Sequence, residues 1–99
     1  MENMTPVLIT TDKDKRGVFF GYVDPDTYDK EHNSITAYNV RMCVYWSSEV
    51  HGVLGLAANG PTAKCRVSPA MPKGRIEGIT LIGECSKEAV EAWEKEPWG

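Results

Sequence analysis

Apolar and polar side chains alternate along residues 35–46, and this is the clearest pattern in the chain. Successive side chains of a strand point to opposite faces of a sheet, so a period of two predicts a β-strand here. Both faces carry apolar groups, which indicates that neither is fully open to water. One face is formed by Tyr38, Val40, Met42, Val44 and Trp46, and the other by Asn39, Arg41, Cys43 and Tyr45.

Two shorter runs of β-branched and aromatic residues precede this strand. Residues 7–11 and 18–23 each predict a strand, and a polar stretch ending at Gly17 separates them. Two such strands joined by a polar turn predict an antiparallel hairpin. The acidic residues 24–33 open with Asp-Pro-Asp, which predicts a turn and then a solvated loop that adds little to the core.

The C-terminal third predicts two more strands and a helix. Residues 63–68 form a short β-type run, and residues 75–85 form a long one with apolar groups on both faces, which is typical of a central strand. Ser86 is a suitable N-cap for the helix that follows, and Pro97 ends it. The apolar stripe of this helix consists of Ala89, Val90 and Trp93.

Residues 47–62 break the periodic pattern with repeated glycines and a proline. The apolar positions between the glycines are compatible with one helical turn or with a tight loop, and we expect a structured loop. Together these elements predict an α+β fold, with a β-rich antiparallel sheet or a small barrel or sandwich and one C-terminal helix.

Length and charge restrict the class of protein. The 99 residues suffice for one hydrophobic core, so we expect a single domain over residues 1–99. The net charge of −3 and the scattered basic residues give little reason to expect direct nucleic-acid binding. The apolar runs are too short to cross a membrane and no signal-peptide pattern opens the chain, so we expect a soluble cytoplasmic protein.

The cysteines and the acidic turn suggest metal sites only weakly. Residues 12–17 imitate the start of a calcium loop, but Arg16 occupies the fifth position and Val23 replaces the bidentate Glu at the twelfth. A plain hairpin turn is favoured there. Three cysteines and one histidine could supply the ligand atoms of a zinc site, but they lack the usual Cys-x-x-Cys spacing. Buried free thiols in a reducing compartment are the simpler interpretation. These residues are Cys43, His51, Cys65 and Cys85.

No catalytic constellation stands out. Ser47 or Ser48 with Glu49 and His51 has the right residue types for nucleophilic catalysis, but residues this close in sequence rarely converge in the geometry required. His32 in the acidic loop is most simply solvated. We therefore expect a binding protein rather than an enzyme, with no cofactor and no metal.

The glycine-rich segment and its aromatic neighbours form the candidate ligand site. Glycines let backbone N–H groups approach a ligand, aromatic rings can stack on a base, and Arg66 can neutralise an anion, which would suit a nucleotide. The alternative is that the glycines only allow the segment to pack against the sheet, and both interpretations remain open. The candidate residues are Tyr45, Trp46, Ser48, Gly52, Gly55, Asn59, Thr62 and Arg66.

Several stretches together resemble a family of small proteins encoded by phages and prophages. They are RMCVYW at 41–46, GVLGLA at 52–57 followed by Gly60-Pro61, Cys65-Arg66, and AWEKEPW at 92–98. The resemblance covers about two-thirds of the chain, within the part from Gly17 onward, and transfers no functional residue.

The resemblance implies an accessory protein that acts against host defences by binding. One mode is sequestration of a nucleotide-type signalling molecule by a homo-oligomer. A second mode is occlusion of a host defence protein, for which the acidic loop at residues 24–31 would serve. A third possibility is a structural or assembly component, which would expose an apolar patch built from Trp93 and Trp98.

Overall fold

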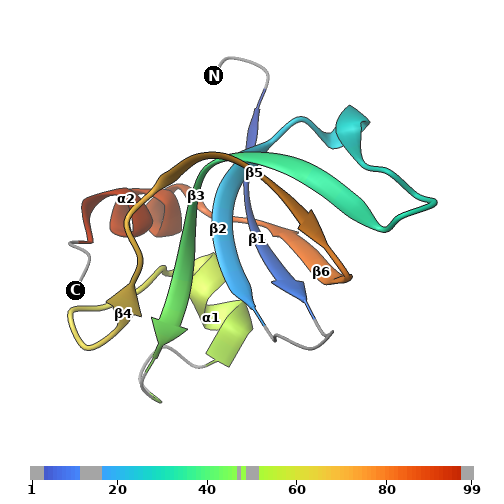
Figure 1. Cartoon of the computed structure of the whole chain (residues 1–99). Coiled ribbons are helices and arrows are strands. Elements are labelled where there is room, and N and C mark those ends of the chain that lie inside the picture. The colour runs from blue at the N-terminus through green and yellow to red at the C-terminus, as the bar shows by residue number, and fades with distance from the viewer. Residues whose placement is uncertain (1–3, 12–16, 47, 49–51, 97–99) are drawn as a thin grey trace.

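The computed structural model describes residues 4–11, 17–46, 48 and 52–96, and it is a β-rich α+β fold (Figure 1). A six-stranded antiparallel sheet carries two helices, of which the last follows the final strand. The elements are β1 (Thr5–Thr11), β2 (Val18–Val23), the 3-10 turn η1 (Pro25–Thr27), β3 (Ser34–Tyr45), α1 (Gly52–Ala58), β4 (Arg66–Val67), β5 (Met71–Glu77), β6 (Ile79–Glu84) and α2 (Lys87–Lys95).

The strands lie in the order β4-β3-β2-β1-β6, and β5 pairs with β3 beside β4. The predicted hairpin is confirmed, because β1 and β2 pair antiparallel from Thr5 opposite Val23 to Thr10 opposite Val18. The predicted strand at residues 35–46 is confirmed as β3, the longest strand of the sheet. Its length lets β3 pair with β2 on one side and with both β4 and β5 on the other.

Each face of the sheet has its own hydrophobic core. Both helices cover one face, which we call the helical face, and the strong curvature of the sheet encloses the other, the concave face (Figure 1). The buried core of the helical face consists of Leu8, Val18, Phe20, Cys43, Leu56, Cys65, Val67, Ala89 and Trp93. The buried core of the concave face consists of Val7, Ile9, Val23, Ile35, Ala37, Val40 and Ile76.

The long central strand predicted at residues 75–85 is wrong in both length and place. The chain bends at Gly78, whose φ of 69° favours glycine, and becomes two strands. The first, β5, pairs with β3, and the second, β6, pairs with β1, so the segment joins the two margins of the sheet. Its apolar residues on alternating sides reflect this wrapping rather than a central position.

A β-bulge at Asn39 corrects the predicted faces of β3. Phe20 lies opposite Arg41 and Tyr22 opposite Tyr38, so β3 carries one residue more than β2 over this stretch. Asn39 takes a φ of 51°, which Asn tolerates better than most residues. The extra residue reverses the alternation, so Tyr38 faces the helical side with Tyr22, whereas Val40 belongs to the concave core.

The helix predicted after Ser86 is confirmed as α2. The Ser86 hydroxyl accepts the Ala89 N–H at 3.0 Å, which is the expected N-cap contact. Trp93, on the buried face of α2, stacks on Phe20 with ring centroids 5.2 Å apart. Its indole N–H donates to the Leu56 carbonyl at 3.1 Å and so ties α2 to α1.

Arg41 is the one charged residue in the buried set of the described chain, with 7% of its surface exposed. Its Nε donates to the Ser68 carbonyl at 2.9 Å, and its guanidinium also donates to the Trp93 carbonyl near the end of α2. Burial lowers the pKa of Arg41, and the charge of Glu96 opposes this effect. A cation suits the negative end of the helix dipole, so Arg41 joins the sheet to the C-terminus of α2.

The two remaining predictions for the middle of the chain are corrected by the structure. Residues 52–58, expected within a structured loop, form the helix α1, which packs against α2 and β1. The strand expected at residues 63–68 is limited to the two residues of β4. Weak local patterning is overridden in both cases by packing against the helical face of the sheet.

Candidate functional site

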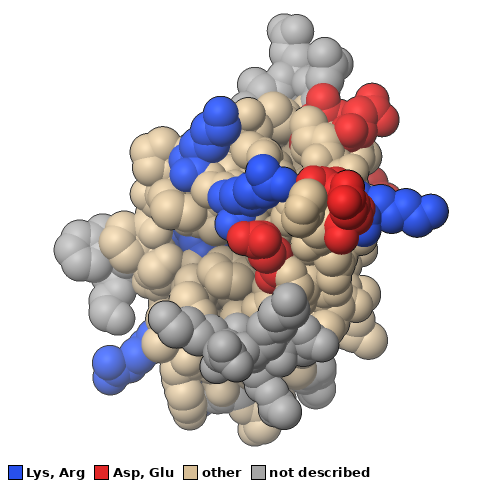
Figure 2. All heavy atoms as spheres, turned by 45° about the vertical axis from the view of Figure 1, so that its right-hand side comes forward, with Lys and Arg blue, Asp and Glu red and all other residues tan. Residues whose placement is uncertain are grey.

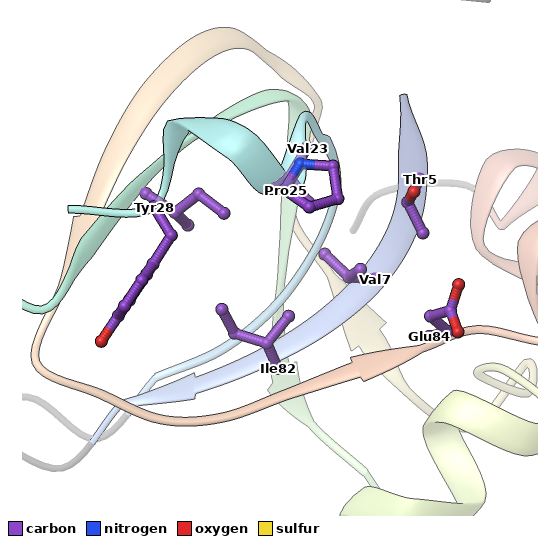
Figure 3. Close-up of a pocket in the computed structure, with 8 residues that line it drawn as sticks. Thr5, Val7, Val23, Pro25, Tyr28, Ile82 and Glu84 are labelled. Carbon is purple, nitrogen blue, oxygen red and sulfur yellow. The ribbon is translucent and has the colours of Figure 1, made fainter. Parts of the chain in front are cut away.

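A cavity of about 190 Å³ opens at one end of the concave face, between β1, β6 and η1 (Figure 3). Thr5 and Glu84 are its polar residues. Apart from the Tyr28 hydroxyl, the rest of the lining is apolar and comes from Val7, Val23, Pro25, Tyr28, Ile35 and Ile82.

Strand register brings these residues together. Val7 lies opposite Glu84, and Ile9 lies opposite Ile82, so the side chains of Ile82 and Glu84 point to the same concave face as the core residues of β1. Thr5 lies opposite Val23 at the end of the hairpin. The bounding strands therefore place their concave-facing side chains around one opening.

The wall opposite β6 is formed by the segment after η1, and a chain of hydrogen bonds fixes it. The Tyr28 hydroxyl donates to the Asn33 side-chain oxygen at 2.6 Å. The amide nitrogen of the same Asn33 donates to the Ile79 carbonyl at 2.9 Å, at the start of β6. This connection links the tyrosine hydroxyl to the start of β6 and so fixes one wall of the opening.

Two of the lining residues are large and exposed. Tyr28 has 40% of its surface exposed and Ile82 has 38%, so both offer apolar surface at the opening. The sequence placed residues 24–33 in a solvated loop with little contact to the core, and the contribution of Pro25 and Tyr28 to this cavity corrects that expectation. In the sequence, the feature that indicates this contact is the single tyrosine, Tyr28, in a mostly polar loop.

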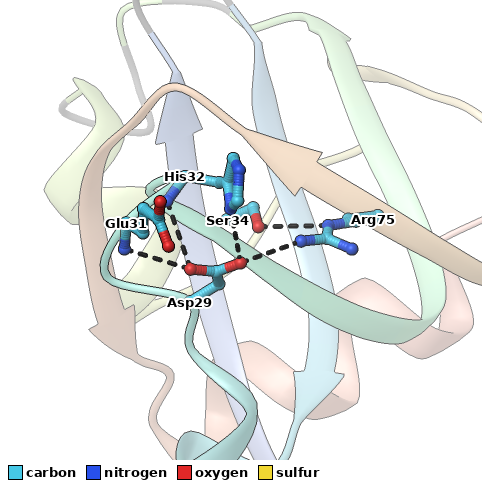
Figure 4. A network of polar contacts seen from close by, with 5 residues as sticks. All are labelled: Asp29, Glu31, His32, Ser34 and Arg75. Atoms are coloured by element: carbon cyan, nitrogen blue, oxygen red, sulfur yellow. Dashed lines mark hydrogen bonds and ion pairs between the residues drawn. The ribbon is translucent and has the colours of Figure 1, made fainter.

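A polar network lies beside the cavity, between the same loop and β5 (Figure 4). His32 Nδ1 lies 2.8 Å from Asp29 Oδ2, and the Arg75 guanidinium lies 3.1 Å from the same oxygen. The His32 side-chain hydrogen bond is the largest cause of the lowered pKa of Asp29. Arg75 Nε also donates to the Ser34 hydroxyl at 3.1 Å.

This network closes the loop rather than forming a nucleophilic site. Asp29 and Ser34 exchange backbone hydrogen bonds of 2.7 and 3.1 Å, and the Asp29 carboxylate accepts the N–H groups of Glu31 and His32. Ser34 is fully buried, and its oxygen accepts from Arg75. The geometry therefore stabilises the loop that carries Tyr28.

The structure separates most of the candidate ligand residues predicted from the sequence. Tyr45 and Arg66 lie opposite each other at the ends of β3 and β4, and both are exposed. Trp46 is partly buried against the core of the helical face. Ser48 is exposed, and Thr62 lies near Cys65, whose sulfur accepts the Thr62 N–H at 3.4 Å.

The glycines of the same segment lie in or next to α1. Gly52 begins this helix, and Gly55 is buried within it. Asn59, just beyond the helix, is exposed, and its N–H donates to the Gly55 carbonyl at 2.8 Å. Gly60 packs directly against α2, because a Cβ there would lie 2.6 Å from the Ala92 Cβ. Packing thus accounts for Gly60.

The cysteines gather on the helical face of the sheet. Cys43 and Cys65 are buried in that core, and Cys85 packs against its edge, all as free thiols. Burial, with a smaller effect of nearby Cys65, raises the pKa of Cys43 to about 12, and burial raises that of Cys85 to about 11. His51 and residues 12–16 of the calcium-like stretch lie outside the described residues.

Charged side chains of both signs lie among uncharged residues on one face of the molecule. Figure 2 shows Lys and Arg side chains lying next to Asp and Glu side chains on the face turned toward the viewer. Within the described residues, three or more His, Cys, Asp or Glu side chains nowhere converge in a group that could hold a metal ion. Nor is any described helix long and apolar enough to cross a membrane.

The fold and the cavity define a small β-rich α+β domain with a preformed apolar opening. Residues 4–93 match the model of the family described as Domain of unknown function (DUF6948), and the protein belongs to this family. Searches of curated proteins and of solved structures give no match to the chain.

Proposed function

We propose that this protein acts by binding another protein, and that the cavity between β1, β6 and η1 receives one apolar side chain of the partner. The observation that carries this proposal is the preformed cavity of about 190 Å³ with largely apolar walls. A site of this kind stabilises a complex by removing apolar surface from water.

The size of the cavity favours a side chain over a free metabolite. Pockets for drug-sized ligands usually enclose about 300–1,000 Å³, whereas a cavity of about 150 Å³ already accommodates benzene. The opening therefore matches one aromatic ring or one branched aliphatic group. Burial of such a group is worth about 1.5–3 kcal/mol, so further contacts with a larger partner are needed for useful affinity.

The nearby polar network supports binding rather than catalysis. The His32 ring forms a hydrogen bond with Asp29, whereas the buried Ser34 hydroxyl accepts one from Arg75. We propose on this basis that the network orders the loop behind Tyr28 and that the protein is not an enzyme.

Methyl NMR with small apolar solutes tests the cavity directly. Toluene and indole should shift the methyl resonances of Val7, Ile35 and Ile82 in a saturable manner. Ile82→Ala removes part of the wall and should weaken toluene binding about fourfold or more, because each buried methylene is worth about 0.8 kcal/mol. Leu54→Ala is the matched control, since Leu54 lies on α1, outside the cavity lining, with 72% of its surface exposed.

Two results would contradict the proposal. One is the absence of saturable shifts at the cavity methyls with either solute. The other is an equal effect of the two alanine substitutions on toluene binding.

A nucleotide-type ligand is the second candidate, and it has a specific observation in its favour. Tyr45 and Arg66 lie opposite each other, and Tyr45 has 53% of its surface exposed, so a ring and a cation are available together. Such a pair suits a base and a phosphate. Titration with AMP, GMP and a cyclic dinucleotide tests it: Tyr45→Ala and Arg66→Ala should both abolish binding, whereas Tyr28→Ala should not.

The biological setting stays a prediction. Occlusion of a host defence protein by a phage-encoded protein is compatible with the proposed site, because the acidic loop expected to take part in it carries Pro25 and Tyr28 of the cavity. The assembly alternative loses part of its motivation, because Trp93 is fully buried, and Trp98 lies outside the described residues. Homo-oligomer formation and a cytoplasmic location likewise remain predictions.

A further inference from the structure

The outer edge of β6 lies next to the cavity and offers backbone groups for pairing. Among the strands that the structure describes, β6 pairs with β1 alone and ends the sheet. An edge strand exposes the N–H and C=O groups of every second residue, and these can bond to an added strand.

The hydrogen-bond pattern identifies which residues present those groups. The Cys85 N–H donates to the Pro6 carbonyl at 3.0 Å, so Pro6 and Cys85 form a hydrogen-bonded pair. Bonded and non-bonded pairs alternate along an antiparallel ladder. The next pair, Val7 with Glu84, is therefore non-bonded, and so is Ile9 with Ile82. Ile82 and Glu84 thus point their backbone N–H and C=O groups away from β1, toward the outer edge.

The side chains of the same two residues point toward the cavity. Both line it, and Figure 3 shows them on the same side of β6, toward Val7. A strand that bonded to Ile82 and Glu84 would place its own directly opposite side chains on this face. Backbone pairing and insertion of a side chain into the cavity are therefore compatible in one extended segment.

The charge around the opening restricts the chemistry of that segment. Glu84 lines the cavity and is exposed, and the acidic residues Asp24 and Asp26 are the chain neighbours of Pro25, which also lines it. The residues that line the cavity include no Lys or Arg. A basic side chain opposite Glu84 would complement this charge, and an acidic one would be repelled.

We propose that an extended segment of the partner protein adds to the β6 edge antiparallel, with an apolar residue opposite Ile82 and a Lys or Arg opposite Glu84. In the partner segment the basic and the apolar residue are two positions apart, and antiparallel pairing places the basic one nearer the N-terminus. Antiparallel addition matches the rest of the sheet and is the more stable form of pairing per residue. This inference rests on the proposed function, because the apolar residue enters the same cavity.

Short synthetic peptides provide the test. The probe is the N-acetylated, C-amidated heptapeptide Thr-Thr-Lys-Thr-Ile-Thr-Thr, and binding is followed through the methyl resonance of Ile82 and the backbone N–H resonances of Ile82 and Glu84. Three control peptides are compared with it. The first has Glu in place of Lys, the second places Lys and Ile next to each other, and the third exchanges the positions of Lys and Ile. The parent peptide should bind at least threefold more tightly than each control.

N-methylation separates strand pairing from simple insertion of a side chain. In the proposed register, the backbone N–H of the peptide Ile faces β6, whereas the N–H of the Thr before it faces away. Methylation of the Ile nitrogen should abolish binding, and methylation of the Thr nitrogen should leave it within about threefold. Glu84→Gln should weaken the parent peptide about two- to fivefold, as expected for an exposed ion pair, and Glu77→Gln on β5 should have no effect.

The outcomes separate this inference from the function on which it rests. Equal binding of the two N-methylated peptides, or a preference for the reversed order, would overturn edge pairing even if toluene still enters the cavity. Failure of both toluene and every peptide to shift the Ile82 methyl would overturn the proposed function as well. Binding of the parent peptide that is lost on methylation of the Ile nitrogen alone supports both.

Discussion

Substitution of Gly60 by alanine should destabilise the protein strongly, because this residue lies in the tight contact between α1 and α2. Gly60 has a φ of 82°, and its N–H donates to the Leu56 carbonyl at 3.1 Å just after the end of α1. A Cβ at this position would lie 2.6 Å from the Ala92 Cβ and 2.9 Å from the Ala89 carbonyl oxygen. Alanine would therefore have an unfavourable backbone conformation and also force the helices apart.

Two costs determine the magnitude of this effect. A left-handed conformation costs a non-glycine residue about 1–2 kcal/mol. Overpacking of a well-packed contact adds about 1–3 kcal/mol, and the backbone oxygen at Ala89 cannot move aside like a flexible side chain. Gly60→Ala should thus lower the free energy of unfolding by about 2–5 kcal/mol, a large part of the total for a small domain.

Gly52→Ala is the matched control. Gly52 has a similar φ of 77°, but a Cβ there would meet nothing within 4 Å. This variant has the backbone cost of about 1–2 kcal/mol without the steric one. Equilibrium urea denaturation followed by far-UV circular dichroism gives both values, and their difference isolates the cost of packing. If the two variants lose the same free energy of unfolding, the inferred contact between Gly60 and α2 is refuted.

Three further predictions concern buried polar groups and the helix cap. Arg41→Met should lower the free energy of unfolding in urea by about 1.5–3 kcal/mol more than Arg66→Met, because only Arg41 is a buried donor to two carbonyls; equal losses would contradict its structural role. Ser86→Ala should cost about 1 kcal/mol through loss of the N-cap, against less than about 0.5 kcal/mol for Ser48→Ala, as measured by thermal melting. The pKa of Cys43 is raised from 9.0 to about 12, so the folded state holds this proton more tightly and the free energy of unfolding should fall as pH rises from 9.0 toward 12. Cys43→Ala should flatten that fall in urea titrations, and an unchanged pH profile would count against the burial of this thiol.

Local sequence patterns were sufficient for the hairpin, for β3 and for α2. Each of these depends on interactions between neighbours in the chain: strand periodicity, a polar turn, or a capping serine such as Ser86 before an apolar stripe. The same local patterns gave wrong predictions of side-chain faces and strand length where an extra residue or a bend interrupts the two-residue period of a strand. Asn39 reverses the faces of β3, and Gly78 divides one apparent strand into two. Neither effect is visible until partner strands fix the register.

The glycine-rich segment shows how packing overrides weak propensity. Its glycines suggested a loop around a ligand, but α1 forms there because Leu56 is buried against the sheet and Trp93 bonds to its carbonyl. Helices this short gain most of their stability from tertiary contacts. The sequence left ligand binding and packing open as reasons for the glycines, and packing explains Gly60.

The sequence by itself determined the β-rich α+β class, the hairpin, the longest strand and the final helix, because those features follow from contacts between near neighbours. Only the tertiary structure decided the candidate site. Its walls combine Val7, Tyr28 and Ile82, which lie on three segments far apart in the chain. They meet because β6 returns to pair with β1 and because Asn33 fixes the loop against it. Such convergence depends on strand order and curvature, which long-range pairing sets and local periodicity does not encode.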